Sequence, residues 1–212
     1  RNHPLTYYLY KGTRRGFDFE LLQKFADEQG LVLEVILPPT WEDMIPYLLE
    51  GKGDIIASMM TVTDERRQRI EFTLPYQQVW QVAVGHQDTL PPRTINELAG
   101  RKVLVRKGSS YDEHLRALRD STAISFDIVY HDEVGDAEDP IQLVANDRAD
   151  LTVVDNTIAQ LEQQFYPDLR IGASLTESQD IAWGVRPNAP DLLSSLNEFI
   201  DRYDRSAFYN IL

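Results

Sequence analysis

Short apolar runs alternate with helix-like patterns along most of the chain. The apolar runs are rich in β-branched residues, and we predict strands over 31–37, 54–60, 102–106, 124–130 and 151–154. Between them, apolar residues recur at helical spacing. We predict helices over 18–29, before Gly51, before Gly100, through Arg119, from Pro140 and over 155–165. Alternating strands and helices predict an α/β fold with mostly parallel sheets.

Three of these helices carry signals for their first residues. Thr40 with Asp43, and Thr94 with Glu97, have the spacing of a capping box, in which the two side chains satisfy backbone N–H groups. Asp139 precedes a proline, which favours the first position of a helix. We therefore expect helices to begin soon after Thr40, Thr94 and Asp139.

Two longer extended segments, 78–85 and 180–185, each follow a complete set of strand–helix units. A last predicted helix, 190–203, comes after the second segment. This order predicts two lobes, each a mostly parallel sheet flanked by helices, joined by two crossing hinge strands. We place residues 1–84 and 184–212 in lobe 1 and residues 85–183 in lobe 2.

Composition and charge exclude several classes of protein. The 212 residues carry a net charge of −13, so a basic surface for nucleic acid is not expected. The absence of cysteine excludes disulfides, thiolate catalysis and cysteine zinc sites. The four histidines lack metal-ligand spacing, no phosphate-binding glycine motif is present, and no cofactor is expected. The acid-rich segment 132–139 lacks the spacing of a calcium loop, which favours a solvated loop.

Two strand-to-helix junctions are candidate anion sites. Residues 61–66 (TVTDER) follow a predicted buried strand and open a helix, whose N–H groups attract anions; Thr61 adds a hydroxyl and Arg66 a planar guanidinium. The alternative is a Thr63 cap with Arg66 exposed to solvent. At the second junction, Gly108 permits close backbone approach, and Ser109 and Ser110 can contact an anion or simply cap the helix.

Two further side chains are candidates for contacting a ligand. Asp155 ends an apolar strand, where it can receive an ammonium group or cap the next helix. Trp41 can stack on a flat or aliphatic group of a ligand, or belong to the core or its rim. Ligands of α/β sheets favour the carboxyl ends of strands, where both junctions and Asp155 lie.

These motifs resemble the type II periplasmic solute-binding proteins of the polar amino acid family over almost the whole chain. The matching stretches are 16–21 (GFDFEL), 41–57 and, most specifically, 61–66 (TVTDER) followed by 70–76 (IEFTLPY). The resemblance implies the two-lobe type II fold and recognition of an amino acid or short peptide by hinge closure. It also implies a location in the periplasm or on the outer cell surface, free or tethered to the membrane through flanking sequence.

The resemblance also implies roles for individual residues. Arg66 would bind the ligand carboxylate with Thr61 and Ser110, next to Ser109. Asp155 and the backbone carbonyl of Met59 would bind the ammonium group. Trp41 would stack on the ligand side chain. Met59 stands where the family has a small residue, which implies a reshaped side-chain pocket.

A narrower resemblance is to the solute-binding domain of membrane-bound lytic transglycosylase F, carried by 1–8 (RNHPLTYY) and 104–111 (LVRKGSSY). The chain starts at Arg1, and we expect it to be a processed or excised piece of a longer polypeptide that lacks the family's first strand. A transporter receptor beside a permease, a sensor domain and a transglycosylase regulator remain open contexts. We expect binding without catalysis. The alternative is an enzyme that resembles the periplasmic cyclohexadienyl dehydratases of the same fold.

Overall fold

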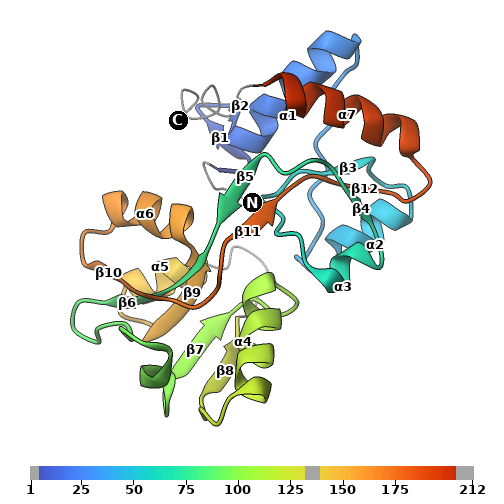
Figure 1. The fold of residues 1–212 in the computed structure, drawn as a ribbon. Coiled ribbons are helices and arrows are strands. Elements are labelled where there is room, and N and C mark those ends of the chain that lie inside the picture. The colour runs from blue at the N-terminus through green and yellow to red at the C-terminus, as the bar shows by residue number, and fades with distance from the viewer. Residues whose placement is uncertain (1–4, 132–138, 204–212) are drawn as a thin grey trace. The chain divides into compact units, whose positions relative to one another are not determined.

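The computed structural model describes residues 5–131 and 139–203, and it divides the chain into two compact units. Unit 1 contains residues 1–38, 43–78 and 180–212, and unit 2 contains residues 39–42 and 79–179. Strands β5 (Gln77–Val79) and β11 (Gln179–Ile181) pair where the chain passes from one unit to the other (Figure 1). Most of the predicted acid-rich loop (132–138), the first four residues and the last nine lie outside the described residues.

Unit 1 contains four helices and a small sheet among its described residues. The helices are α1 (Phe17–Gln29), α2 (Met44–Leu49), α3 (Asp64–Arg67) and α7 (Pro190–Arg202). The strands β3 (Ile55–Ile56), β12 (Gly184–Val185) and β4 (Glu71–Phe72) form an antiparallel sheet in that order. The hairpin of β1 (Tyr8–Tyr10) and β2 (Thr13–Arg15) leads into α1.

The core of unit 1 is aromatic and lies between α1 and α7, which run side by side in Figure 1. The rings of Phe25 and Phe199 meet edge to face at 5.5 Å, and Trp183 stacks on Phe199 at 6.4 Å. Gly16 begins α1 with a φ of 128°, and a Cβ there would collide with the carbonyl oxygen of Thr6. A glycine is therefore required at this position, and it sets where α1 and its first residues lie.

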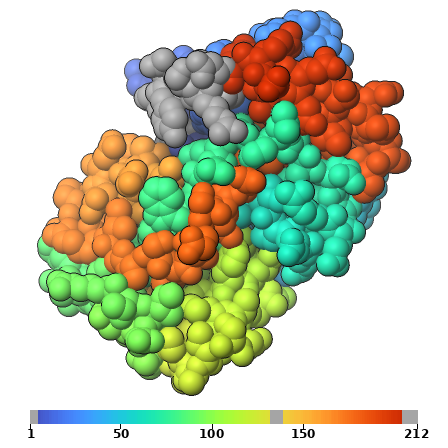
Figure 2. Space-filling model, in the orientation of Figure 1, coloured from blue at the N-terminus to red at the C-terminus, as the bar shows by residue number. Residues whose placement is uncertain are grey.

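Unit 2 is built on a five-stranded mixed sheet. Its strands, in spatial order, are β10 (Leu169–Ser174), β6 (Gln81–His86), β9 (Leu151–Asp155), β7 (Lys102–Val105) and β8 (Asp127–Tyr130). The β9–β7 and β7–β8 pairs are parallel, whereas β6 runs antiparallel to both β9 and β10. In Figure 2 the green residues around β6 lie against the orange residues around β10, as this pairing requires.

Helices cover both faces of this sheet. Ala83 and Val153 pack in a cluster with residues of β7 and α4 (Ser110–Ser121), while Val82 and Val154 pack with α5 (Pro140–Ala145) and α6 (Asn156–Phe165). Successive strand residues point to opposite faces, so β6 and β9 are buried throughout. Because helices cover both faces of the sheet, the strands need apolar residues at almost every position, which explains the apolar runs in the sequence. The predicted α/β class is confirmed.

The predicted strand over 31–37 is wrong. Residues 31–38 form no regular element, and several of their apolar side chains are exposed, with Val32 97% exposed. A strand requires a neighbour to accept and donate its backbone hydrogen bonds, and none of the described strands pairs with this segment. A propensity for strand structure without a pairing partner leaves the segment irregular.

The predicted caps had mixed outcomes. Asp139 precedes α5, Pro140 is its first residue, and the Asp139 N–H donates to Oε1 of Gln142 at 3.3 Å, so this start is confirmed. The helix predicted after Thr40 is confirmed as α2, but the capping box is wrong, because Asp43 is the residue before the helix and makes no side-chain capping bond. Thr94 precedes a 3₁₀ turn, η1 (Ile95–Leu98), rather than an α-helix. None of the helices in the described ranges is long and apolar enough to cross a membrane.

Candidate functional site

Arg66 is buried at the end of the first candidate junction. Arg66 is only 3% exposed, whereas the nearby Arg67 and Arg69 are exposed. Thr63 caps α3 by accepting the Arg66 N–H at 3.3 Å, so the cap that the alternative for this junction contained is present. The other part of that alternative, Arg66 exposed to solvent, is wrong. Because burying a guanidinium is costly, the fold must satisfy this one with specific acceptors.

One acceptor of Arg66 belongs to the segment that carries two other candidates. Its Nη1 donates to the carbonyl oxygen of Thr61 at 2.8 Å. Thr61 is buried and forms a bridge with Ile181, and the neighbouring Met60 carbonyl accepts the N–H of Ala182. The structure therefore brings Thr61 and Arg66 together within unit 1, on a backbone segment held from the other side by residues 180–182.

Met59 precedes this segment in an unusual conformation. Its φ is 49°, in the left-handed region that residues with a Cβ rarely adopt. Its N–H donates to Oδ2 of Asp18 at 2.8 Å, and its side chain is buried. The same carboxylate accepts the Tyr76 hydroxyl at 2.7 Å and the Trp183 Nε1–H at 3.0 Å on Oδ1. Four buried residues from distant parts of the sequence thus form one network.

Asp18 is the titrating group of this network. Burial raises its pKa from 3.8 to about 6. The three hydrogen-bond donors lower this pKa, but burial has the larger effect. Since the native pKa lies above the unfolded value, the native state holds the proton more tightly. The stability that this proton contributes is present below pH 3.8 and is lost as the pH rises through about 6.

We therefore expect a pH-dependent stability that requires Asp18. Between pH 3.8 and 7, the free energy of unfolding should lose a contribution of about 3 kcal/mol, which is the pKa difference converted at 1.36 kcal/mol for each pH unit. Urea unfolding at a series of pH values measures it. In Asp18→Asn this contribution should be absent, whereas Asp27→Asn, which changes an exposed carboxylate on the same helix, should retain it. Identical curves for the wild type and Asp18→Asn would contradict the assignment.

The second candidate junction lies at the start of α4 in unit 2. Ser109 caps the helix by accepting the Asp112 N–H at 3.3 Å, and its hydroxyl donates to the Arg106 carbonyl at 2.7 Å. Ser110, the first helical residue, is buried. The capping alternative therefore describes the Ser109 hydroxyl, while Ser110 stays a candidate for ligand contact.

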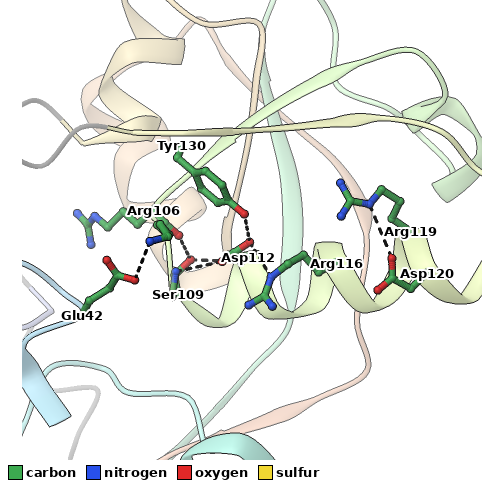
Figure 3. Close-up of polar contacts among 10 residues, drawn as sticks. Glu42, Arg106, Ser109, Asp112, Arg116, Arg119, Asp120 and Tyr130 are labelled. Atoms are coloured by element: carbon green, nitrogen blue, oxygen red, sulfur yellow. Dashed lines mark hydrogen bonds and ion pairs between the residues drawn. The ribbon is translucent and has the colours of Figure 1, made fainter. Parts of the chain in front are cut away.

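Asp112 organises this loop, as Figure 3 shows. Its carboxylate accepts the Gly108 N–H at 3.0 Å, the Tyr130 hydroxyl at 3.0 Å and the Arg116 Nε–H at 3.1 Å. Gly108 has a φ of 68°, so the loop turns sharply before the helix. A buried carboxylate with three donors gives the loop one defined shape.

Asp155 is buried at the carboxyl end of β9, next to the same helix. Its N–H donates to the Tyr111 hydroxyl at 3.3 Å, and the phenol also hydrogen-bonds the Asp155 carboxylate. Burial and this carboxylate raise the pKa of Tyr111 well above its ordinary value, so the phenol stays protonated. Tyr111 thus joins the start of α4 to Asp155 within unit 2.

Trp41 lies in the bend before α2, partly exposed, and groups by its contacts with unit 2. The seven candidates therefore fall into two sets. Unit 1 holds Met59, Thr61 and Arg66, and unit 2 holds Trp41, Ser109, Ser110 and Asp155. No group of histidine, aspartate and glutamate side chains within residues 5–131 and 139–203 is arranged to hold a metal ion.

Sequence reasoning missed the residues that support these candidates. Asp18 and Tyr76 lie in the matching stretches 16–21 and 70–76, but neither had a role assigned to it. Tyr111 ends the stretch 104–111. A polar residue inside an otherwise apolar stretch was the available signal, since such a residue must find a partner when buried.

Comparison with known proteins places the chain in a family. The sequence pattern of the bacterial extracellular solute-binding proteins, family 3, matches residues 1–212. A relative from Desulfosudis oleivorans, named membrane-bound lytic murein transglycosylase F, is 37% identical over 200 residues. That match covers 94% of this chain but only 43% of the relative.

Solved structures agree in fold. A variant of ArgBP from T. maritima has a TM-score of 0.84 and 29% identity, covering 99% of this chain and 89% of that one. The arginine-bound form of a truncated ArgBP from T. maritima has a TM-score of 0.80 and 29% identity, covering 94% and 91%. The predicted type II solute-binding fold is confirmed. This chain belongs to the bacterial extracellular solute-binding proteins of family 3.

Proposed function

We propose that the chain binds an amino acid or a short cell-wall peptide outside the cytoplasm, and that Arg66 with Thr61 recognises the ligand carboxylate. The observation that carries this proposal is the burial of Arg66. Of the three arginines at 66, 67 and 69, only Arg66 is withdrawn from solvent, which serves recognition of an anion rather than solubility. A guanidinium offers the planar pair of donors that matches a carboxylate.

In the same proposal, Asp155 and the Met59 carbonyl bind the ligand ammonium, Ser110 assists at the carboxylate and Trp41 stacks on the side chain. Ser109 acts through the shape of its loop, because its hydroxyl caps α4. A zwitterion would satisfy a cation of unit 1 and an anion of unit 2 at once. The ligand would therefore bind the closed arrangement of the two units more tightly than the open one. This difference in affinity would drive hinge closure.

The context that we favour is regulation of a lytic transglycosylase by a binding domain. The 37% identical relative from Desulfosudis oleivorans supports it, and this chain spans 43% of that relative. A catalytic domain and a membrane tether would then belong to sequence flanking this chain. The chain itself would bind without turnover. A receptor for a permease and a sensor domain use the same site chemistry and are distinguished by the ligand.

A thermal-shift panel tests the proposal. The twenty amino acids, diaminopimelate and muropeptides are added to the protein, because a ligand of the native state raises the melting temperature by mass action. A shift with one amino acid supports a receptor or sensor, and a shift only with cell-wall compounds supports the transglycosylase regulator. No shift with any of them would contradict the proposed function. Small-angle scattering with the active ligand tests closure, for which the radius of gyration should fall.

The dehydratase alternative is not favoured by the relatives, which are binding proteins and transglycosylases by name. It makes a separate prediction, since dehydration needs a positioned general acid and consumes the substrate. Incubation with prephenate followed by ultraviolet detection of the aromatic product decides between the two. Turnover that depends on the protein would overturn the proposal of binding alone.

The link between Tyr111 and Asp155 predicts a further effect on affinity. Tyr111→Phe removes the hydroxyl that fixes Asp155, and we expect ligand affinity to fall about 10-fold. Titration calorimetry measures it with the ligand found in the panel. Tyr166→Phe is the control, because it removes a hydroxyl from a half-buried tyrosine of unit 2 that packs in the cluster beside α5 and α6 and not in the candidate site. Equal losses in both variants would show that Tyr111 has no special role.

A further inference from the structure

The buried carboxylate of Asp18 connects the core of unit 1 to the candidate binding segment. Its Oδ1 faces the core donors Tyr76 and Trp183, and its Oδ2 accepts the Met59 N–H at 2.8 Å. Gly16, through its close approach to Thr6, fixes the start of α1 and hence the position of Asp18. The carboxylate is thus held by rigid neighbours on one side and holds Met59 on the other.

Met59 needs such support because its backbone is strained. A left-handed conformation costs a residue with a Cβ about 1–2 kcal/mol, and it persists only where the surroundings enforce it. The bond to Asp18 is charge-assisted and belongs to the stronger class of hydrogen bonds. The orientation of the peptide at Met59, whose carbonyl is assigned to the ligand ammonium, therefore depends on Asp18.

The network can accept a proton without moving its heavy atoms. When Asp18 is ionised, Tyr76 donates to Oδ1 at 2.7 Å. When Oδ1 is protonated, it can donate to the Tyr76 oxygen instead, and the phenol can turn its own proton to Met59 Sδ, which lies 3.8 Å away. The Met59 N–H then loses its anionic acceptor and keeps only a neutral one, which is a weaker partner.

Within its hydrogen-bond network, Asp18 is the group that changes charge near neutral pH. Of its three donors only Tyr76 titrates, and burial beside Asp18 raises the pKa of that phenol well above its ordinary value. Arg66, the buried cation that contacts Thr61, keeps its charge throughout. A ligand ammonium at the Met59 carbonyl would add a positive charge close to Asp18 and favour the carboxylate.

We propose that Asp18 is a positioning residue that holds Met59 for the ligand ammonium, so that ligand binding releases a proton from the Asp18 carboxyl group. The inference rests on the proposed function for the ligand and on the Asp18 network for the coupling. On binding, the Oδ1–H bond breaks, the proton passes to the buffer and the electron pair stays on the carboxylate. The affinity for an amino acid should therefore fall as the pH is lowered through 6.

Titration calorimetry at pH 6 in two buffers of different ionisation enthalpy measures the released proton. L-arginine and L-glutamine are the probes, because neither titrates near this pH. We expect release of up to about half a proton for each ligand bound, since the group is about half protonated there. Asp18→Asn should bind about 10-fold more weakly at pH 7.5 and release none, because it has no proton to lose and cannot satisfy all three donors. Equal release by Asp18→Asn and the wild type would overturn the coupling.

Nuclear magnetic resonance without ligand keeps the test independent of the proposed function. Between pH 4.5 and 7.5 the Met59 amide and the Trp183 indole N–H should shift together with one midpoint near 6. Asp18→Asn should abolish both shifts, and Asp27→Asn should leave them unchanged. Tyr76→Phe should raise the midpoint, because one donor to the carboxylate is lost. A Met59 amide that does not titrate in the wild type would overturn the positioning role, whereas failure of every amino acid and cell-wall compound of the thermal-shift panel to bind would count only against the proposed function.

Discussion

Arg66→Ala is expected to abolish binding of the ligand while the protein stays folded. In the proposed function, removing the buried guanidinium would leave the ligand carboxylate without its charged partner. Hydrogen bonds to charged groups contribute about 1.5–3 kcal/mol each, so losing two predicts a fall in affinity of 100-fold or more, roughly. Titration calorimetry measures the affinity, and circular dichroism during heating shows that the fold persists.

The neighbouring arginine provides the matched control. Arg67→Ala removes the same charge from the same short helix, but Arg67 is exposed, so affinity should change less than about 2-fold. Arg66→Lys keeps the charge and loses the planar pair of donors, and it should fall between the two. Full affinity in a folded Arg66→Ala protein would remove the carboxylate assignment.

Trp183→Ala is expected to cause the largest loss of stability of any single change discussed. Trp183 is fully buried, stacks on Phe199 and contacts the Tyr76 ring at 5.6 Å. Truncating a buried aromatic residue costs about 3–5 kcal/mol, because the transfer free energy is lost and a cavity remains. The Nε1–H bond to Asp18 is lost as well. Urea unfolding followed by circular dichroism gives the free energy of unfolding.

Trp80→Ala is the control for this change, since Trp80 is 42% exposed. Its replacement should cost about 1 kcal/mol or less, in line with surface substitutions. Trp183→Phe, which keeps most of the ring volume but not the N–H, should lie between the two. Comparable losses from Trp80→Ala and Trp183→Ala would mean that the aromatic core between α1 and α7 does not dominate the stability of unit 1.

Local patterns determined most of the helices and the central strands of this protein. The apolar spacing before Gly30 predicted α1, and Asp139 with its following proline predicted the start of α5. The mainly apolar, β-branched run at 151–154 predicted β9, because both faces of that strand are covered. These signals work since each depends on residues close together in the chain. The motif at 61–66 likewise identified Arg66 and Thr61 before their contacts were known.

Spacing alone could not decide what each candidate contacts. Arg66, Arg67 and Arg69 all lie in one short stretch of the sequence, and only the structure shows that Arg66 is the buried one, with its Nη1 donating to the Thr61 carbonyl. Thr61, like Arg66, was a candidate from the sequence, but the hydrogen bond between the Arg66 guanidinium and the Thr61 carbonyl is seen only in the structure. The same limit applies to the wrong strand over 31–37, because a strand exists only if another segment pairs with it.

The Asp18 network was out of reach of local patterns altogether. Its members come from α1, from the Met59 segment, from the turn at Tyr76 and from the last strand region near Trp183, which is 165 positions from Asp18. Sequence identified the stretches that contain them and the kind of ligand they suit. Only tertiary structure showed that one buried carboxylate ties them together, because the free energy of a buried charge is set by whatever groups the fold brings to it.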